Sequence, residues 1–239
     1  MTHTSAKPIF IAALRREIAA LTKGEGWHPD GEDRGRDIHV YVHADAIVAC
    51  AGMGGHRASL AVEAALAVGP ASELVSVGWA GACNHLVHIG DVIHPTIVID
   101  AKTGERFFVA EPATTEASVI LVTVAAPASA IEKQRLGIHH YASAVDMEAA
   151  AVARIARAHE LPFYAIKAIS DDADFELPDM QRFSTSRGQL REAAFGIHAA
   201  LRPSLWPPII SMAKSSKLAA ERLHVAIQAH IQQHRDRIS

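Results

Sequence analysis

Short apolar runs of strand length alternate with segments of helical spacing, and this alternation is the strongest constraint on the fold of the chain. The runs KPIFIAAL, ELVSVGWAG and PFYAIKAIS are apolar at successive positions, as in strands that are covered on both faces. Segments with helical spacing lie between such runs, and two of them, GHRASLAVEAALAVG and PASAIEKQRLG, are expected to end at Gly69 and Gly137. The sequence therefore predicts an α/β fold with a mixed, mostly parallel central sheet flanked by helices, in three layers.

Composition and charge narrow the class of protein. The 239 residues contain no linker or shift in composition, so we expect a single domain over residues 1–239, with a helical extension from about residue 204. A formal net charge of -3 argues against nucleic-acid partners. No apolar run fits a signal peptide or a transmembrane helix, so membrane contact is not expected. Cys50 and Cys83 lie in apolar runs, which is typical of reduced thiols, and we expect a cytoplasmic protein.

Three carboxylates occupy places where α/β sheets bind ligands. Glu17 and Asp171 come soon after apolar strand-like runs, and Glu148 opens a helical segment. Taken singly, Glu148 is typical of the first turn of a helix and Asp171 of a turn after a strand. Ligands of open α/β sheets bind outside the carboxyl ends of the strands, so the three together favour a site lined with carboxylates.

The motifs around these carboxylates follow the order of a known family. VDMEAAAVA is similar to VEMEATAIA, and KAISDDAD to RAISDVAD. IAALRREI, CAGMGGHRAS, SVGWAGA and GDVIHPTIVID resemble the opening acidic segment, the second glycine loop, the TGSAGG turn and the GDIVVSDEA strand of that family. Over residues 8–200 the chain resembles the nucleoside phosphorylase and nucleosidase superfamily. Its motifs are most similar to those of methylthioadenosine/S-adenosylhomocysteine nucleosidases, and VAAPASAIEK is similar to a segment of hopanoid-associated phosphorylases.

This resemblance implies cleavage of the N-glycosidic bond of a purine nucleoside, through an oxocarbenium-like sugar. It implies that Glu148 accepts hydrogen bonds from the ribose 2′- and 3′-hydroxyls and that Met147 lies against the sugar. One carboxylate with two oxygens suits two adjacent hydroxyls.

The same resemblance makes Asp171 the acid that protonates the leaving purine, with Ser170 orienting its carboxyl group. A carboxylic acid that donates a proton near neutral pH needs a raised pKa. We expect the raised pKa to come from burial or from a neighbouring carboxylate, Asp172 or Asp174.

Two nucleophiles stay open, water and phosphate, and hydrolysis is favoured. Glu17 matches the glutamate that activates water in the hydrolytic members. In the turn SVGW, Ser76 and Trp79 replace the arginine and serine that contact phosphate in the phosphorolytic members. Phosphorolysis to the base and ribose 1-phosphate stays the alternative, and its candidate phosphate-binding residues are Arg15, Arg16, Gly54 and Arg57.

The base and 5′ ends of the substrate are less defined. Ala125 or Ala126 stands where the nucleosidases carry an aromatic residue that stacks on adenine. We expect Gly78 and Trp79 to contact the substrate, with Trp79 as a candidate for the stacking residue. The similarity to the hopanoid-associated group implies an adenosine-type nucleoside with a 5′ substituent. The apolar segment SLWPPIISMAK is expected beside the mouth of the site or at a subunit interface.

No cofactor and no metal are expected. The pairs His85 and His88, and His139 and His140, lack a third acidic ligand in a zinc motif, and GMGG lacks the spacing of a dinucleotide-binding loop. A homo-oligomer is the expected assembly. An alternative of another class is a catalytically inactive nucleoside-binding module.

Overall fold

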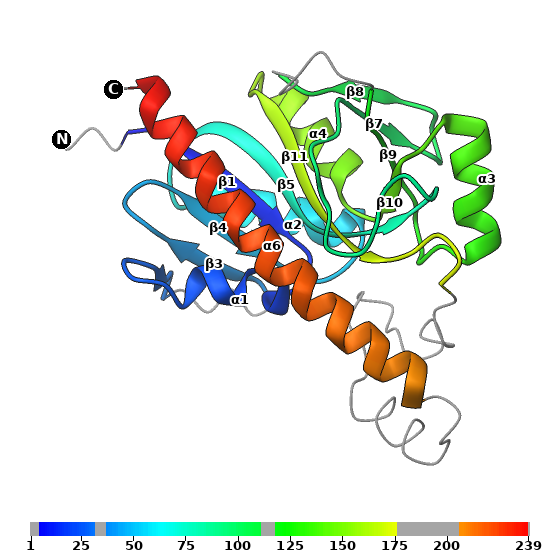
Figure 1. Ribbon diagram of the computed structural model, residues 1–239. Helices are drawn as coiled ribbons and strands as arrows, with labels where there is room; N and C mark the ends of the chain where they lie inside the picture. The colour runs from blue at the N-terminus through cyan, green and yellow to red at the C-terminus, as the bar shows by residue number, and fades with distance from the viewer. Residues whose placement is uncertain (1–4, 32–36, 111–117, 176–205, 239) are drawn as a thin grey trace.

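The computed structural model describes residues 5–31, 37–110, 118–175 and 206–238, and within them eleven strands form one sheet (Figure 1). Across the sheet the order is β2 (His28–Pro29), β3 (His39–Val42), β4 (Ile47–Cys50), β1 (Lys7–Ala12), β5 (Ala71–Ala82), β10 (Ala144–Asp146), β9 (Ile120–Thr123), β7 (Ile97–Asp100) and β8 (Arg106–Phe108). Off this path, β11 (Phe163–Asp171) pairs with β5 and with β6 (Val92–Ile93). The helices are α1 (Arg15–Thr22), α2 (Gly55–Leu66), α3 (Ala130–His140), α4 (Ala149–Ala158) and α6 (Trp206–Ile238).

The strand β5 organises the sheet. Along its length it pairs in parallel with β1 and β11, and near its end Gly81 and Ala82 pair with the antiparallel strand β10. Parallel pairs also join β1 to β4 and β9 to both β7 and β10, whereas the outer strands β2, β3 and β8 are antiparallel to their neighbours. The predicted α/β class, a mixed sheet flanked by helices, is confirmed. Because β1 and β11 run parallel to β5 on its two sides, the residues that follow their carboxyl ends meet at one edge.

Alternating side chains of the central strands build two cores. Ile9 and Ile11 of β1 belong to the core that α2 and α4 cover, and Phe10 belongs to the core that α1 and α6 cover. All three are fully buried. Figure 1 shows the resulting arrangement, with α6 running across one face of the sheet and α2 behind the opposite face.

The C-terminal helix α6 is part of this core. Ala219, Leu223 and Ile227 recur every fourth residue and are fully buried against the sheet, the spacing of an apolar helix face. A polar contact also joins α6 to β5: His230 Nε2 lies 2.6 Å from Oε1 of Glu73. The proline pair of the expected extension stands in the first turn of α6, where the missing N–H groups would have no partner within the helix.

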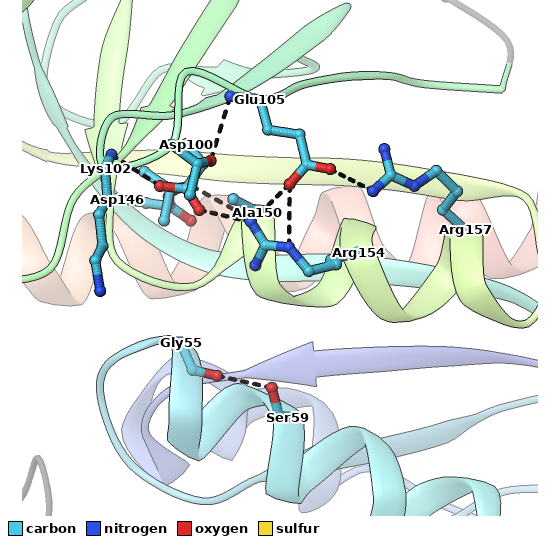
Figure 2. Close-up of polar contacts among 11 residues, drawn as sticks. Gly55, Ser59, Asp100, Lys102, Glu105, Asp146, Ala150, Arg154 and Arg157 are labelled. Carbon is cyan, nitrogen blue, oxygen red and sulfur yellow. Dashed lines mark hydrogen bonds and ion pairs between the residues drawn. The ribbon is translucent and has the colours of Figure 1, made fainter.

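Ion pairs join α4 to the turn between β7 and β8 (Figure 2). Arg154 Nη2 lies 2.6 Å from Asp100 Oδ2 and 2.9 Å from Glu105 Oε2. Arg157, one turn further along α4, also pairs with Glu105. These contacts and the buried alanines of α4 fix the helix whose N-cap residue is Glu148.

The helix α3 differs from its expected form. It does not end at Gly137 but continues to His140, and Tyr141 ends it in the left-handed conformation. Gly137 is required for a different reason. A Cβ atom there would lie 2.6 Å from the carbonyl oxygen of Cys83, so a glycine lets the helix lie against that backbone.

Candidate active site

A cavity of about 660 Å³ opens beside the carboxyl ends of β1, β10 and β11, a size typical of small-molecule sites. Its wall contains seven of the predicted site residues: Arg16, Glu17, Trp79, Met147, Glu148, Ser170 and Asp171. The other four, Arg15, Gly54, Arg57 and Gly78, are not in the wall. The structure therefore brings together the three carboxylates, and of the candidate phosphate-binding residues Arg15 and Arg57 are outside the wall, whereas Arg16 lines it and the N–H of Gly54 contacts Glu148.

Glu17 is held in the cavity by backbone amides. Its Oε2 accepts hydrogen bonds from the N–H groups of Ala13 at 3.0 Å and Leu14 at 2.8 Å, and Oε1 accepts one from Trp79 at 3.3 Å. Gly78 makes room for it, because a Cβ atom there would lie 3.2 Å from Oε2. Burial raises the pKa of Glu17, and the hydrogen bond from Leu14 offsets only part of that effect.

Glu148 is the N-cap residue of α4, and its side chain faces the cavity. Oε1 accepts a 2.6 Å hydrogen bond from the N–H of Gly54, and Oε2 a longer one, 3.3 Å, from Met147. Burial, together with the nearby carboxylate of Asp146, raises the pKa of Glu148 to about 7. The group is thus poised to change its charge near neutral pH.

A buried polar network lies under Glu148. Lys167, which is fully buried, contacts Asp146 Oδ2 at 2.9 Å and Ser76 Oγ at 3.0 Å. Thr123 donates to the other oxygen of Asp146 at 2.6 Å. Burial alone would lower the pKa of Lys167, but the carboxylates of Asp146 and Glu148 outweigh it and the pKa is raised. An ammonium group therefore lies beneath a cavity lined with carboxylates.

Asp171 is held from two sides. Ser170 Oγ donates a 2.7 Å hydrogen bond to its Oδ1, as the resemblance implied for the orienting serine. Its Oδ2 forms an ion pair with Lys133 of α3, a residue that the sequence reasoning missed. Lys133 also donates to the carbonyl oxygens of Asp172 at 2.9 Å and Phe175 at 3.4 Å.

The prediction that a second carboxylate, Asp172 or Asp174, lies next to Asp171 is therefore wrong. Asp172 is exposed, and the side chain of Asp174 is 85% exposed and lies 3.9 Å from His85. These carboxylates point to solvent, where water stabilises their charge. The charged group that contacts Asp171 is the ammonium of Lys133.

The remaining walls are largely apolar. Trp79 lines the cavity, with the guanidinium carbon of Arg16 4.9 Å from its ring centroid. Ala125 and Ala126 are exposed and do not line it; their neighbours Val124, Pro127 and Ala128 do. One side belongs to α6, through Met212, Ala213, Ser216, Lys217 and Ala220. The side chains of Trp206 and Ile209, in the segment expected near the mouth, are outside the described part, and Ile210 is 53% exposed.

The candidate phosphate-binding residues are dispersed. Arg57 is buried in α2, and Arg15 is exposed on α1. The N–H of Gly54 already donates to Glu148. Among these candidates, Arg16 is the residue in the cavity wall.

A cavity outside the strand ends of an α/β sheet is the place where proteins of this class bind small molecules. The family model of the phosphorylase superfamily matches residues 9–133 and 118–201. The chain belongs to the phosphorylase superfamily, a superfamily of enzymes, and the family predicted from its motifs is confirmed.

Solved structures share this fold at low sequence identity. The 5′-methylthioadenosine nucleosidase of Arabidopsis thaliana superposes with a TM-score of 0.70 at 17% identity, over 95% of each chain. A 5′-methylthioadenosine/S-adenosyl homocysteine nucleosidase of Helicobacter pylori gives 0.69 at 16%, over 95% of this chain and 98% of that one. Futalosine hydrolase of Helicobacter pylori gives 0.65 at 18%, over 95% and 100%. No curated protein matches this chain in sequence.

Three further observations concern metals, membranes and thiols. In the described ranges, no three His, Cys, Asp or Glu side chains are grouped as a metal site. None of the described helices is both long enough and apolar enough to cross a membrane. Cys50 and Cys83 are free and buried, and burial raises the pKa of each thiol to about 12.

Proposed function

We propose that this protein hydrolyses the N-glycosidic bond of an adenosine-type purine nucleoside and releases the free base. The observation that carries the proposal is the meeting of Glu17, Glu148 and Asp171 in one cavity, each held by named hydrogen bonds. Cleavage of a nucleoside needs a group for the sugar, a group for the nucleophile and a group for the leaving base. Three separately positioned carboxylates suit these three tasks.

Glu148 is proposed to bind the ribose. Gly54 and Met147 each donate one hydrogen bond to its carboxylate, so further lone pairs on both oxygens are left for the 2′- and 3′-hydroxyls. Hydrogen bonds that strengthen as the sugar becomes cationic stabilise the transition state more than the ground state. Met147, beside it in the wall, is proposed to contact the sugar.

Glu17 is proposed to activate water as the general base. Its pKa, raised by burial, favours proton uptake from water. The amides of Ala13, Leu14 and Trp79 all donate to this carboxylate, so they are not free for a phosphate. A second anion beside Glu17 would also be repelled. These contacts support water over phosphate, although Arg16 in the wall keeps phosphorolysis as the second candidate.

Asp171, oriented by Ser170, is proposed to protonate the leaving purine. Trp79 and the wall of Val124, Pro127 and Ala128 are proposed to enclose the base, with Gly78 acting through the room it gives Glu17. Methylthioadenosine and S-adenosyl homocysteine, named for the neighbouring structures, carry 5′ substituents, and the α6 wall is proposed to contact such a group.

Localisation, cofactor use and oligomeric state are predictions. We propose a cytoplasmic homo-oligomer with no cofactor, and the assembly has one supporting observation. Ile131, Ile138 and Tyr141, on or next to α3, are exposed large apolar side chains, a feature typical of protein contact surfaces. Sedimentation of the purified chain measures the oligomeric state.

One assay tests the reaction. Adenosine, methylthioadenosine and inosine are incubated with the protein in phosphate-free buffer and again with phosphate, and base and sugar are separated by chromatography. Free ribose sugar formed at a rate indifferent to phosphate is the expected result. Ribose 1-phosphate formed only with phosphate contradicts hydrolysis. Tight nucleoside binding without release of base would identify a binding module instead.

A further inference from the structure

Lys133 and Asp171 form a closed pair at the edge of the cavity. The Lys133 side chain is 2% exposed and that of Asp171 is 15% exposed, and both residues line the cavity. Lys133 lies on α3 and precedes Asp171 by 38 residues in the chain. We propose, on the basis of the function proposed above, that Lys133 positions Asp171 and supplies the proton that Asp171 passes to the leaving base.

The structure around the pair is built to hold it. A buried ammonium group costs several kcal/mol unless it is paired and hydrogen-bonded. Lys133 meets this condition with three acceptors for its three hydrogens, the carboxylate of Asp171 and the carbonyls of Asp172 and Phe175. Gly81 of β5 leaves the space, since a Cβ atom there would lie 2.7 Å from Asp171 Oδ2 and 3.0 Å from Lys133 Cε.

Because of this ion pair, the proton needed by the leaving base is on Lys133 and not on Asp171. Asp171 accepts from Lys133 at one oxygen and from Ser170 at the other, and both bonds suit an ionised carboxylate. A carboxylate has no proton to donate to a purine. The ammonium group of Lys133 is the proton source in direct contact with Asp171.

The proposed step balances in atoms and charge. As the glycosidic bond breaks, its electron pair goes to the purine. A proton moves from Lys133 Nζ to Asp171 Oδ2, and the carboxyl group so formed gives a proton to the ring nitrogen of the base. Water adds to the sugar and gives its proton to Glu17. Lys133 is left neutral, and the proton on Glu17 returns to it through solvent after the products leave.

A leaving group that needs no proton separates this role from a structural one. Adenosine and 4-nitrophenyl β-ribofuranoside present the same sugar to Glu17 and Glu148, but 4-nitrophenolate leaves as a stable anion. The variants are Lys133→Met, Lys133→Arg and the control Arg135→Met, which removes an exposed cation from the same helix. Arginine keeps the positive charge but does not release a proton.

We expect Lys133→Met to lower kcat/KM for adenosine about 10²-fold or more, the usual scale of general acid catalysis, while kcat/KM for the nitrophenyl riboside changes little. Lys133→Arg should stay impaired with adenosine, and Arg135→Met should match the wild type with both substrates. Equal losses on both substrates, or adenosine cleavage restored by arginine, overturn the proposal. A wild-type protein that releases no base from adenosine or methylthioadenosine refutes the proposed function itself, so the two failures are distinguishable.

Discussion

The backbone N–H of Gly54 lies 2.6 Å from Oε1 of Glu148, and this hydrogen bond joins the starts of α2 and α4 across 94 residues of sequence. Gly54 has a φ of 93°, a conformation that L side chains rarely adopt. A glycine at this position therefore allows the backbone N–H to point toward the Glu148 carboxylate. This contact orients Glu148 in the cavity wall, and burial gives the same group a pKa of about 7. Position and protonation of Glu148 are thus both set by the fold.

Substrate recognition should depend on pH through Glu148. Below its pKa of about 7 the group is protonated and loses part of its capacity to accept from the two hydroxyls. We expect kcat/KM for adenosine to fall as pH drops through this value, by about tenfold per pH unit. For 2′,3′-dideoxyadenosine, which lacks both hydroxyls, the fall should be shallower. Parallel profiles for the two substrates would show that Glu148 does not contact the sugar hydroxyls.

The same burial should make ionised Glu148 lower the free energy of unfolding. Between the ordinary value of 4.5 and about 7, the folded chain holds a proton that the unfolded chain has lost, so the free energy of unfolding falls with rising pH. Glu148→Gln removes this loss. At pH 8 we expect it to raise the free energy of unfolding by on the order of 1–3 kcal/mol, and at pH 4.5 by little.

Denaturation curves at both pH values measure this difference. Glu63→Gln, on the exposed face of α2, is the control and should show no such dependence. The Glu148 variant should also cleave adenosine poorly, with KM raised and kcat lowered. A variant that is less stable than wild type at pH 8 contradicts the prediction.

The parts of the site that could be predicted from the sequence are those set by local order. Glu17, Glu148 and Asp171 follow strand ends or open a helix, so their common edge follows from a parallel sheet. The lysines were missed because a lysine is expected at the surface. A signal for Lys167 did exist: it lies in the middle of a strand whose flanking residues, Ile166 and Ala168, are buried.

For Lys133 the sequence holds a weaker signal. It is three residues before the buried Leu136 on α3, which indicates a shared face, but the acceptor on that face comes from a distant strand. Gly137 was predicted to end the helix because a glycine often does. Its actual reason, contact with the Cys83 carbonyl, depends on tertiary packing that the sequence does not show.

Asp171→Asn should abolish release of the base and leave nucleoside binding nearly intact. Asparagine keeps the shape but cannot carry the transferred proton, a loss of about 10²–10⁴-fold in kcat. Because Lys133 then lacks its carboxylate partner, we also expect a lower Tm. Asp172→Asn, in the exposed neighbour, is the control and should keep wild-type turnover. Wild-type turnover in the Asp171 variant would remove the residue from the reaction.

Gly78→Ala should affect both stability and activity. Gly78 has a φ of 139°, and an added Cβ atom would press on the Glu17 carboxylate. Gly104→Ala is the matched control, since Gly104 has a φ of 72° and no atom within 4 Å of its Cβ position. Both variants should lose about 1–3 kcal/mol of stability. We expect kcat to fall in the Gly78 variant and to stay at the wild-type value in the Gly104 variant. Equal kcat values in the two variants would show that the space at Gly78 is not needed for the function of Glu17.

The α6 wall should distinguish substrates by their 5′ group. Deleting residues 204–239 is unsuitable as a test, because Ala219, Leu223 and Ile227 are part of the core. Met212 lines the cavity from the exposed half of the same helix, and Met212→Ala removes apolar surface there without touching the core.

We expect Met212→Ala to weaken binding of methylthioadenosine by about 1 kcal/mol, which is several-fold in KM, because a methylthio group would lose an apolar contact. The KM for adenosine, which lacks that group, should change far less. Ile210→Ala is the control, since Ile210 is 53% exposed and does not line the cavity. Comparison of KM for both nucleosides across the three proteins decides the outcome. Equal changes for methylthioadenosine and adenosine would place the 5′ group elsewhere in the cavity and leave Met212 with a role in stability alone.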